Sequence, residues 1–352
     1  MIGCGSRASG KRARCDTFCN RAEGGDRRSV SIPPWGLDRP PLVPEIAATL
    51  IRASFASVDV DGIAHLGSGW DFDAFVTRDG WVFRFPRRAE CAATLDAERR
   101  IHDLVARALL PSVAIPRFDL LGEPSAAFPY RFAGYRFIPG VPSDALSPAL
   151  LTTTALTIGL ALGAIHGIPD DEARASGLRE WPTDDPDHQQ WLERTIAATD
   201  ALRGFDPTVD RSLDWLATHG SRTPRPFPGP LRCIHNDLSP EHLLVDRRTG
   251  ALAGILDWSD AIVGDPALDF APLAAFHGWA FVDEVVRSYP LPIDGSFRER
   301  LRFMARLLSV IWLIEAYQQG AEATPDVAKH VRWVHNVFGE TGHREETDDA
   351  CT

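Results

Sequence analysis

Features that would tie the protein to a membrane or to an oxidising compartment are absent from the sequence. No apolar run reaches the roughly 18 residues that a membrane-spanning helix needs, and the nearest one, residues 150–168, contains threonines and a histidine that suit a buried helix. The Arg-rich N-terminal segment has no apolar stretch of the kind found in secretory signals. The six cysteines show neither paired Cys-x-x-Cys motifs nor a disulfide pattern. We therefore expect a cytoplasmic protein with no membrane partner.

Positive charge is scarce as well. The chain has 37 lysine and arginine residues against 48 aspartate and glutamate residues, which gives a formal net charge of −11 at pH 7. This balance argues against broad nucleic-acid binding and is compatible with a cationic small-molecule substrate. With 352 residues, of which 44% are hydrophobic, the chain is long enough for two lobes with separate cores. We expect a monomer or a weak dimer.

Residues 231–258 combine apolar runs with polar residues suited to chemistry. The segment begins LRCIHNDLSPEHLLVD and ends, after a polar turn, with ILDW. Two short apolar runs on either side of the turn predict a hairpin over residues 243–256. A hairpin brings its two ends together, so we expect Asp237, His242 and Asp257 to converge on one site.

These three residues supply groups that phosphoryl transfer requires. A carboxylate within reach of an acceptor hydroxyl can orient it and take its proton, which is the role expected of Asp237. A second carboxylate, with a side chain five residues after the first, can hold Mg²⁺ against nucleotide phosphates, and this assigns Asp257 and His242 to the metal. The alternative is a hairpin with three unrelated polar residues, which the joint spacing disfavours.

The same segment resembles a known family. Residues 235–238 (HNDL) followed by His242 are similar to the catalytic loop of the aminoglycoside/macrolide phosphotransferases, which are relatives of the protein kinases. Residues 255–258 (ILDW) resemble the metal-binding segment of that family, and residues 264–269 (GDPALD) resemble the element that follows it. Protein kinases have Asn where His242 stands, whereas the macrolide phosphotransferases resemble this chain in having His. The resemblance covers roughly residues 61–335.

The resemblance implies an α+β, protein-kinase-like fold of two lobes, with ATP or GTP as co-substrate and Mg²⁺ as cofactor. We expect residues 1–42 to form a disordered tail. Residues 43–138 are expected to form a small antiparallel β lobe with one long helix, which binds the nucleotide. Residues 139–340 are expected to form a larger, mainly helical lobe that carries catalysis and substrate binding. The Pro- and Gly-rich residues 138–141 mark the hinge.

Periodicity and turn residues predict the individual elements. The expected small-lobe strands are 63–66, 71–77, 81–85, 117–123 and 130–138. The expected helices are one that begins at Pro44 and those at 89–109, 148–168, 187–202, 207–219, 266–277, 279–289, 295–319 and 325–338. Ser147 is expected to cap the helix at 148–168.

Two small-lobe segments are candidates for nucleotide contact. Gly67, Ser68 and Gly69 lie between two expected strands, where glycines let backbone N–H groups approach phosphates. A turn of this kind in a hairpin is more often only a turn, and this one lacks the third glycine of the kinase pattern. The residues that the resemblance assigns to the purine slot are Arg136, Phe137 and Ile138.

A phosphate clamp is expected on the third small-lobe strand. Residues 81–84 (WVFR) stand where the kinase template has its Val-Ala-Ile-Lys strand. Strand alternation places Arg84 on the face opposite Trp81 and Phe83, toward the nucleotide. The resemblance implies that Arg84 binds phosphate oxygens and that Glu98, on the following helix, is its ion-pair partner.

Two further acidic residues are expected to act on structure. Asp265 and Asp269 lie where a helix begins, so each can cap that helix or tie down the catalytic loop through His235. We favour these roles over metal binding. His235 is likewise expected to orient the backbone rather than to act as the base.

Substrate contacts are expected from the helices that follow the metal-binding segment. The acidic candidates for binding an ammonium group are Asp260, Asp283, Glu284 and Glu315. The apolar candidates for a macrolide ring are Phe276, Trp279, Phe281, Trp312 and Tyr317. The net charge favours an aminoglycoside and His242 favours a macrolide, so both antibiotic classes stay open.

Other functions remain as alternatives. Small-metabolite kinases of the choline, homoserine, sugar or fructosamine type share this catalytic loop. A pseudokinase that serves as a binding module is disfavoured because Asp237, Asp257, Arg84 and Glu98 are all present. A protein kinase is disfavoured because the sequence has no Asp-Phe-Gly or Ala-Pro-Glu segment.

Overall fold

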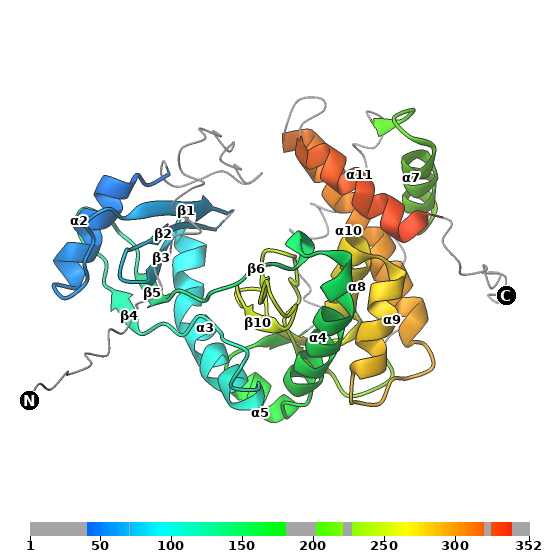
Figure 1. Cartoon of the computed structure of the whole chain (residues 1–352), viewed down its shortest axis with the longest axis horizontal. Helices are drawn as coiled ribbons and strands as arrows, with labels where there is room; N and C mark the ends of the chain where they lie inside the picture. The colour runs from blue at the N-terminus through cyan, green and yellow to red at the C-terminus, as the bar shows by residue number, and fades with distance from the viewer. Residues whose placement is uncertain (1–40, 70, 181–201, 221–226, 320–324, 340–352) are drawn as a thin grey trace, which may run out of the picture.

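The computed structural model describes residues 41–69, 71–180, 202–220, 227–319 and 325–339. They form two lobes, a strand-rich one on the left of Figure 1 and a mainly helical one on the right. The two-lobed α+β architecture expected from the sequence is confirmed. The expected tail (1–42), helix (187–202) and chain end (340–352) lie outside the described residues, apart from 41, 42 and 202 at their edges.

The small lobe is built on one antiparallel sheet. Its five strands, in spatial order, are β1 (Ala64–Ser68), β2 (Phe72–Val76), β3 (Trp81–Pro86), β5 (Phe132–Arg136) and β4 (Leu120–Gly122). Every neighbouring pair is antiparallel, as expected. The turn between β2 and β3 has Gly80 at a φ of 84°, a conformation that glycine adopts without steric cost.

A helix covers each face of this sheet (Figure 1). α2 (Pro44–Ser54) packs on the face that carries Phe83. α3 (Ala89–Ala108) packs on the face that carries Val82, and Arg84 points the same way, toward α3. The alternation expected for β3 is therefore confirmed, and it places a cation on the inner face of an otherwise apolar strand.

The long helix α3 belongs to the cores of both lobes. Its first half packs Cys91 and Leu95 against the small-lobe sheet. Its second half contributes Ile101, Leu104 and Val105 to the large-lobe core. In Figure 1 the helix accordingly runs from the sheet down to the large lobe. A single rigid element therefore fixes the sheet relative to the catalytic lobe.

The hinge docks onto a strand of the large lobe. Val141–Pro142 forms β6, which pairs antiparallel with β9 (Leu243–Val245). A Cβ atom at Gly140 would lie 2.9 Å from the Cβ atom of Leu244. Glycine is required there because any side chain would collide with the strand that the hinge crosses.

α4 (Leu151–His166) starts later than expected. Two short 3-10 turns, Ser143–Ala145 and Pro148–Leu150, precede it, and Ser147 makes no capping hydrogen bond with its side chain. The stretch Pro148–His166 is long and apolar enough to cross a membrane by length and composition alone. In the fold it is a core helix that packs against α9 and β8, as its threonines and histidine suggested.

The large lobe combines two small sheets with a layer of helices. The first sheet has the order β10 (Leu252–Ile255), β9, β6, and the second has the order β7 (Arg179–Glu180), β11 (Ile262–Gly264), β8 (Arg232–Ile234). The helices after α4 include α5 (Asp170–Ala175), α7 (Pro207–His219), α8 (Ala267–His277), α9 (Trp279–Ser288), α10 (Phe297–Gln319) and α11 (Pro325–Phe338). The expected hairpin is β9–β10. The elements α5, β6, β7 and β11 were not expected, because each is too short to show a period.

Candidate active site

The catalytic loop leaves β8 through a left-handed residue. Asn236 has a φ of 67°, a conformation that asparagine tolerates better than most residues. Asp269, in the first turn of α8, holds the loop through two hydrogen bonds to its backbone. Its Oδ2 accepts a hydrogen bond from His235 N at 2.9 Å, and its Oδ1 accepts one from Asn236 N at 2.7 Å. The loop thus presents the Asp237 side chain 38% exposed, open to an incoming hydroxyl.

Both acidic residues after the metal-binding segment have structural contacts. Asp269 hydrogen-bonds to His166 Nε2 at 3.0 Å, and His166 Nδ1 lies 2.8 Å from Tyr289 Oη. Burial alone would raise the pKa of Asp269, but His166 and the loop amides outweigh it and lower that pKa below its ordinary value. Asp265 Oδ1 accepts a hydrogen bond from Ala267 N at 3.0 Å at the start of α8. The loop-tying and capping roles expected from the sequence are confirmed.

His235 orients backbone on both sides of the site. Its Nε2 donates to Leu256 O at 2.9 Å, and its Nδ1 accepts from Asp237 N at 3.2 Å. Burial lowers the pKa of His235, so the ring stays neutral and keeps this pair of bonds. The ring therefore acts as a spacer between the two loops that carry Asp237 and Asp257.

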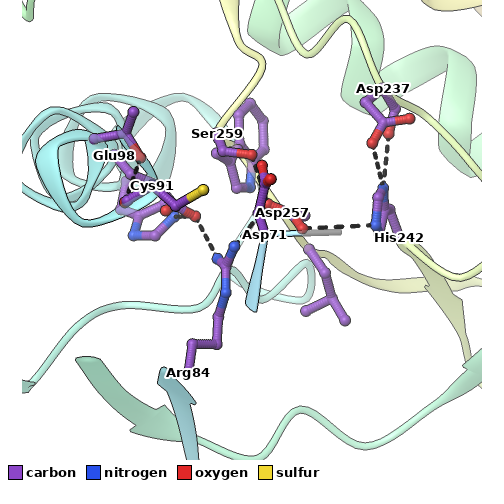
Figure 2. A network of polar contacts seen from close by, with 12 residues as sticks. Asp71, Arg84, Cys91, Glu98, Asp237, His242, Asp257 and Ser259 are labelled. Atoms are coloured by element: carbon purple, nitrogen blue, oxygen red, sulfur yellow. Dashed lines mark hydrogen bonds and ion pairs between the residues drawn. The ribbon is translucent and has the colours of Figure 1, made fainter. Parts of the chain in front are cut away.

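The structure brings Asp237, His242 and Asp257 together. Figure 2 shows His242 between the two carboxylates. His242 Nδ1 lies 3.2 Å from Asp237 Oδ2, and His242 Nε2 lies 3.8 Å from Asp257 Oδ2. Burial opposes a charge on His242, but the carboxylates of Asp237 and Asp257 raise its pKa to about 10. In the free protein His242 is therefore an imidazolium that holds the two acidic groups in place.

Asp257 is fixed by contacts from both lobes. Its φ is 56°, a left-handed conformation that is uncommon for residues other than glycine. Its Oδ1 accepts hydrogen bonds from Arg84 Nη2 and from Ser259 Oγ, both at 2.9 Å. Burial would raise the pKa of Asp257, but Arg84 and His242 outweigh it and hold that pKa well below its usual range. Asp257 is therefore a carboxylate at any physiological pH.

Arg84 connects the sheet, α3 and the catalytic lobe. Its Nη1 donates to Glu98 Oε1 at 2.6 Å, and its guanidinium lies 4.0 Å from the ring centre of Phe72. Burial opposes the charges of Arg84 and Glu98, but Asp257 and then Glu98 outweigh it and raise the pKa of Arg84, and Arg84 and then His102 outweigh it and lower the pKa of Glu98. Figure 2 shows the guanidinium between Glu98 on α3 and Asp257. The expected pairing of Arg84 with Glu98 is therefore present, and the contact with Asp257 was not anticipated.

Gly67 and Ser68 are the last residues of β1, paired with Ala74 and Asp73, so they do not lie between strands as expected, and Gly69 begins the turn toward β2. This segment, the glycine turn, has space at both of its glycines. A Cβ atom at either glycine would meet no other atom within 4 Å, and neither glycine has a left-handed φ. Packing and φ therefore do not require glycine here. The register of β1 and β2 shifts between His65 and Gly67, where a bulge favours glycine, and the space at both glycines also allows a ligand to approach the backbone. The amide of Gly69 already donates to Phe72 O at 2.9 Å, so Gly69 offers space rather than a free N–H.

The three residues assigned to the purine slot lie in different environments. Arg136 is exposed, and its guanidinium stacks 3.8 Å above the ring of Trp81, on the sheet face opposite Arg84. Strand alternation turns the Arg136 side chain outward, so Arg136 can offer its backbone groups to the slot, and the assignment of these residues to the purine stays a prediction. Phe137 packs against the cluster of Val82 on the inner face, and Ile138 is buried.

Of the acidic substrate candidates, Asp260 lies at the site. Surrounding protein atoms, then the carboxylates of Asp237, Asp257 and Asp71, raise the pKa of Asp260 to about 7. The side chain is nevertheless exposed, so repulsion between carboxylates is the cause that persists when the site is wet. Asp260 is therefore placed to meet a cation that arrives beside Asp237.

The other substrate candidates are engaged elsewhere. Asp283 and Glu284 on α9 form ion pairs with Arg298 and Arg287. Glu315 lies half-buried on α10. The aromatic residues named as apolar candidates contribute to the cores of the large lobe: Phe276 and Phe281 are buried and offer no groove surface, whereas Trp279, Trp312 and Tyr317 are partly exposed. Their spacing along the helices is explained by core packing, which produces the same pattern as a ligand-binding face.

Several residues of the site were missed by sequence reasoning. Ser259 binds Asp257, and His102 lies behind Glu98, with Nε2 3.6 Å from Glu98 Oε1. Asp73 and Arg87 are fully buried beneath the glycine turn. The sequence signal for Asp73 is a charged residue within an apolar strand, between Phe72 and Ala74.

The donor atoms at the site suit a metal that arrives with a nucleotide. Asp257 Oδ1 is occupied by Arg84 and Ser259, which leaves Oδ2 facing His242 Nε2. No group of three or more His, Cys, Asp or Glu residues is arranged to hold a metal ion within the part of the chain that the structure describes. Mg²⁺ usually takes one or two protein ligands and completes its coordination with phosphates and water. His242 would join such a site only after losing the proton on Nε2.

Known proteins share both the sequence pattern and the architecture. A model of the phosphotransferase enzyme family matches residues 62–305. An uncharacterized protein of Bacillus subtilis (strain 168), YcbJ, is 26% identical over 250 residues, which are 66% of this chain and 76% of that protein.

Solved structures are similar in fold. The GDP complex of wild-type aminoglycoside 2'-phosphotransferase-IIIa has a TM-score of 0.63 and 21% identity, and the match covers 84% of this chain and 99% of that chain. The macrolide 2'-phosphotransferase MphH from Brachybacterium faecium has a TM-score of 0.52 and 23% identity, with coverage of 84% and 99%. These likenesses establish a protein-kinase-like fold. Because the family model spans well over half of the chain and includes Arg84, Asp237 and Asp257, the protein belongs to the phosphotransferase enzyme family.

Proposed function

We propose that this protein transfers the γ-phosphate of ATP or GTP to a hydroxyl group of a small molecule, with Mg²⁺ as cofactor. One observation carries the proposal, a continuous chain of polar contacts through both lobes (Figure 2). It runs from Glu98 to Arg84 at 2.6 Å, to Asp257 at 2.9 Å, to His242 at 3.8 Å and to Asp237 at 3.2 Å. A phosphate-binding cation is thereby held beside an open carboxylate. The nucleotides named in complexes of similar fold, GDP and ATP, support a nucleotide co-substrate.

In the proposed reaction Asp237 accepts the proton of the acceptor hydroxyl. The hydroxyl oxygen forms a bond to the γ-phosphorus, the bond from that phosphorus to the β–γ bridging oxygen breaks, and the nucleoside diphosphate leaves. Arg84, held by Glu98, binds phosphate oxygens and offsets their charge. His242 Nδ1 donates to Asp237 O at 2.9 Å and so keeps the catalytic loop in register. Mg²⁺ bound by Asp257 would neutralise charge on the phosphates.

For the acceptor we infer a cationic molecule of the aminoglycoside type. Asp260 is exposed beside Asp237, and the net charge of −11 attracts cations. Two of the aromatic side chains considered for a macrolide ring, Phe276 and Phe281, are buried in the core of the large lobe. The kanamycin and gentamicin complexes named among proteins of similar fold support the same class.

The test is kcat/KM for one aminoglycoside and one macrolide, each with ATP and with GTP, at low and high salt. We expect turnover of the aminoglycoside that falls steeply as salt rises, since screening weakens attraction between exposed charges. Turnover of the macrolide alone would contradict the acceptor class. Turnover of a metabolite alcohol such as choline, with neither antibiotic a substrate, would leave the kinase chemistry and remove the antibiotic assignment. An enzyme inactive toward all of them would contradict the proposed function.

A further inference from the structure

A buried ion pair lies behind the glycine turn, on the side away from Arg84. Asp73 on β2 and Arg87, just after β3, are both 0% exposed, and Arg87 Nε lies 3.7 Å from Asp73 Oδ1. Asp73 is paired in register with Phe85, whose side chain packs in the core beneath α2. The pair therefore lies on the face of the sheet opposite Arg84.

The pair is bonded to the turn itself at two points. Ser68 Oγ donates to Asp73 Oδ1 at 2.8 Å. Arg87 Nη1 donates to the carbonyl oxygen of Gly69. Arg87 N also donates to Asp71 O at 2.8 Å, where the turn rejoins β2. One side of the turn is thus held through a hydroxyl, and the other through two carbonyls.

Stability does not account for this pair. Removing two charges from water costs free energy that their attraction often fails to recover, and apolar residues of similar size are frequently as stable in such places. What an apolar pair cannot do is hold a hydroxyl and a carbonyl at defined positions, because it has no donors or acceptors. The contacts of Asp73 and Arg87 therefore point to position rather than stability as their contribution.

The positioned segment is the one that shows space for a ligand. A Cβ atom at Gly67 or Gly69 would meet no other atom within 4 Å, so there is free space at both glycines. Ser68, between them, has its hydroxyl directed to Asp73 rather than outward. A turn whose side chain is tied back and whose outer side is bare presents backbone to whatever approaches it.

We propose that Asp73 and Arg87 are positioning residues that hold the Gly67–Gly69 turn in the shape that receives nucleotide phosphates. The inference rests on the proposed function, since it assigns the turn to the phosphates of the nucleotide co-substrate. It adds two residues that act through the turn and contact no substrate. The pair should matter for the phosphates and not for the base, because the base binds at the hinge side of the small lobe.

The experiment compares triphosphates with nucleosides. Affinities of Mg–ATP, Mg–GTP, adenosine and guanosine are measured by calorimetry for the wild-type chain, for Asp73→Asn, for Arg87→Lys, and for the double variant Asp73→Leu/Arg87→Met. Leu50→Ala is the control, because Leu50, on α2, lies in the core of the same lobe. We expect each pair variant to lose about tenfold in triphosphate affinity, while nucleoside affinity stays at the wild-type level.

The double variant keeps the test decisive if a single variant fails to fold, since it leaves no unpaired buried charge. A folded double variant that binds triphosphate as the wild type does would overturn the inference. Equal losses for triphosphate and nucleoside, or an equal triphosphate loss in Leu50→Ala, would overturn it too, because both indicate general damage to the lobe. A wild-type chain that binds no triphosphate would overturn the proposed function together with this inference, whereas normal wild-type binding with unaffected variants overturns the inference alone.

Discussion

At the scale of single residues, the site is organised by one histidine between two carboxylates. His242 carries a positive charge in the free protein because Asp237 and Asp257 raise its pKa to about 10. A divalent cation on Asp257 would repel that charge and favour the neutral ring, whose Nε2 is then free to bind. The other ring nitrogen remains bonded to Asp237 O, which keeps the ring in one orientation.

Asp237→Asn removes the proton acceptor while preserving the size of the side chain. We expect kcat to fall by roughly 100-fold or more, with nucleotide affinity nearly unchanged, because the base acts on the acceptor hydroxyl. Steady-state kinetics and calorimetric titration with Mg–ATP measure the two quantities. Asp283→Asn is the matched control, since Asp283 pairs with Arg298 on the surface of α9. Full turnover by Asp237→Asn would exclude Asp237 as the base.

Asp257→Ala and His242→Asn separate the two expected metal ligands. The first is expected to weaken Mg–nucleotide binding strongly, because it removes the hard oxygen donor and the partner of Arg84. The second should be tolerated, since an amide oxygen suits Mg²⁺ at least as well as an imidazole nitrogen. Nucleotide titrations at several Mg²⁺ concentrations measure both effects. Equal damage from the two changes would show that the hydrogen bond of His242 to the catalytic loop, rather than metal ligation, is its main contribution.

The raised pKa of Asp260 predicts a pH-dependent acceptor affinity. A carboxyl group is neutral below its pKa and charged above it, so a cationic acceptor should bind more tightly as pH rises through that raised value. KM for the acceptor measures this trend in the wild type and in Asp260→Asn. Titration of the acceptor's own amines affects KM equally in both proteins, so it cancels when the two pH profiles are compared. Identical pH profiles would show that Asp260 does not contact the acceptor.

At the scale of elements, α8 couples the catalytic loop to the hinge. Asp269 in its first turn binds the amides of the catalytic loop. His277 at its last position lies with Nε2 3.1 Å from Ser143 Oγ, in the 3-10 turn after the hinge strand. Ser143 N in turn donates to Pro240 O in the catalytic loop. One helix therefore sets the spacing between the hinge and the catalytic carboxylate.

His277 makes stability depend on pH in the acid range. Burial lowers its pKa to about 4 from an ordinary value near 6.5, so the unfolded chain binds its proton at higher pH than the folded chain does. The contribution of the neutral ring is complete above pH 6.5 and is lost as pH falls toward 4. We expect the wild type to lose about 2 kcal/mol more than His277→Gln over that window, after allowance for partial exposure. Urea unfolding at pH 7, 5.5 and 4.5 measures it, and parallel losses in both proteins would contradict the assignment.

At the scale of the whole molecule, the lobes share a helix and a strand-like contact. α3 contributes to both cores, and Ala114, beyond its end, exchanges backbone hydrogen bonds with Ala253 O at 2.8 Å and Ile255 N at 3.0 Å. Arg100 on α3 also donates to Ser176 O at 2.9 Å. The small lobe is thus not an independent unit joined only by the hinge.

This sharing predicts a single cooperative unfolding transition. Calorimetry should give equal calorimetric and van't Hoff enthalpies, because neither lobe keeps its core when α3 unfolds. Leu104 is buried on α3 in the large-lobe core, so Leu104→Ala should lower the free energy of unfolding of that single transition by about 2–5 kcal/mol. An exposed substitution on the same helix, Arg99→Ala, is the control and should change stability little. Two resolved transitions, with only one shifted by Leu104→Ala, would contradict the coupling.

The sequence by itself determined the features that depend on neighbouring residues. The hairpin β9–β10 follows from two apolar runs around a polar turn, and it brings Asp237, His242 and Asp257 together because they are close along the chain. The direction of Arg84 follows from strand alternation alone. The roles of these residues in catalysis and metal binding stay predictions, because position does not establish chemistry.

Only the tertiary structure decided contacts between segments that are far apart in the chain. Arg84 meets Asp257 across 173 positions, and no local pattern encodes that distance. The same limit applies to Phe276 and Phe281, since aromatic residues at helical spacing form the same pattern whether they face a ligand or a core. For Asp73 the sequence showed only a charge within an apolar strand, and the burial of Asp73 and Arg87 was decided by the surfaces that pack over them.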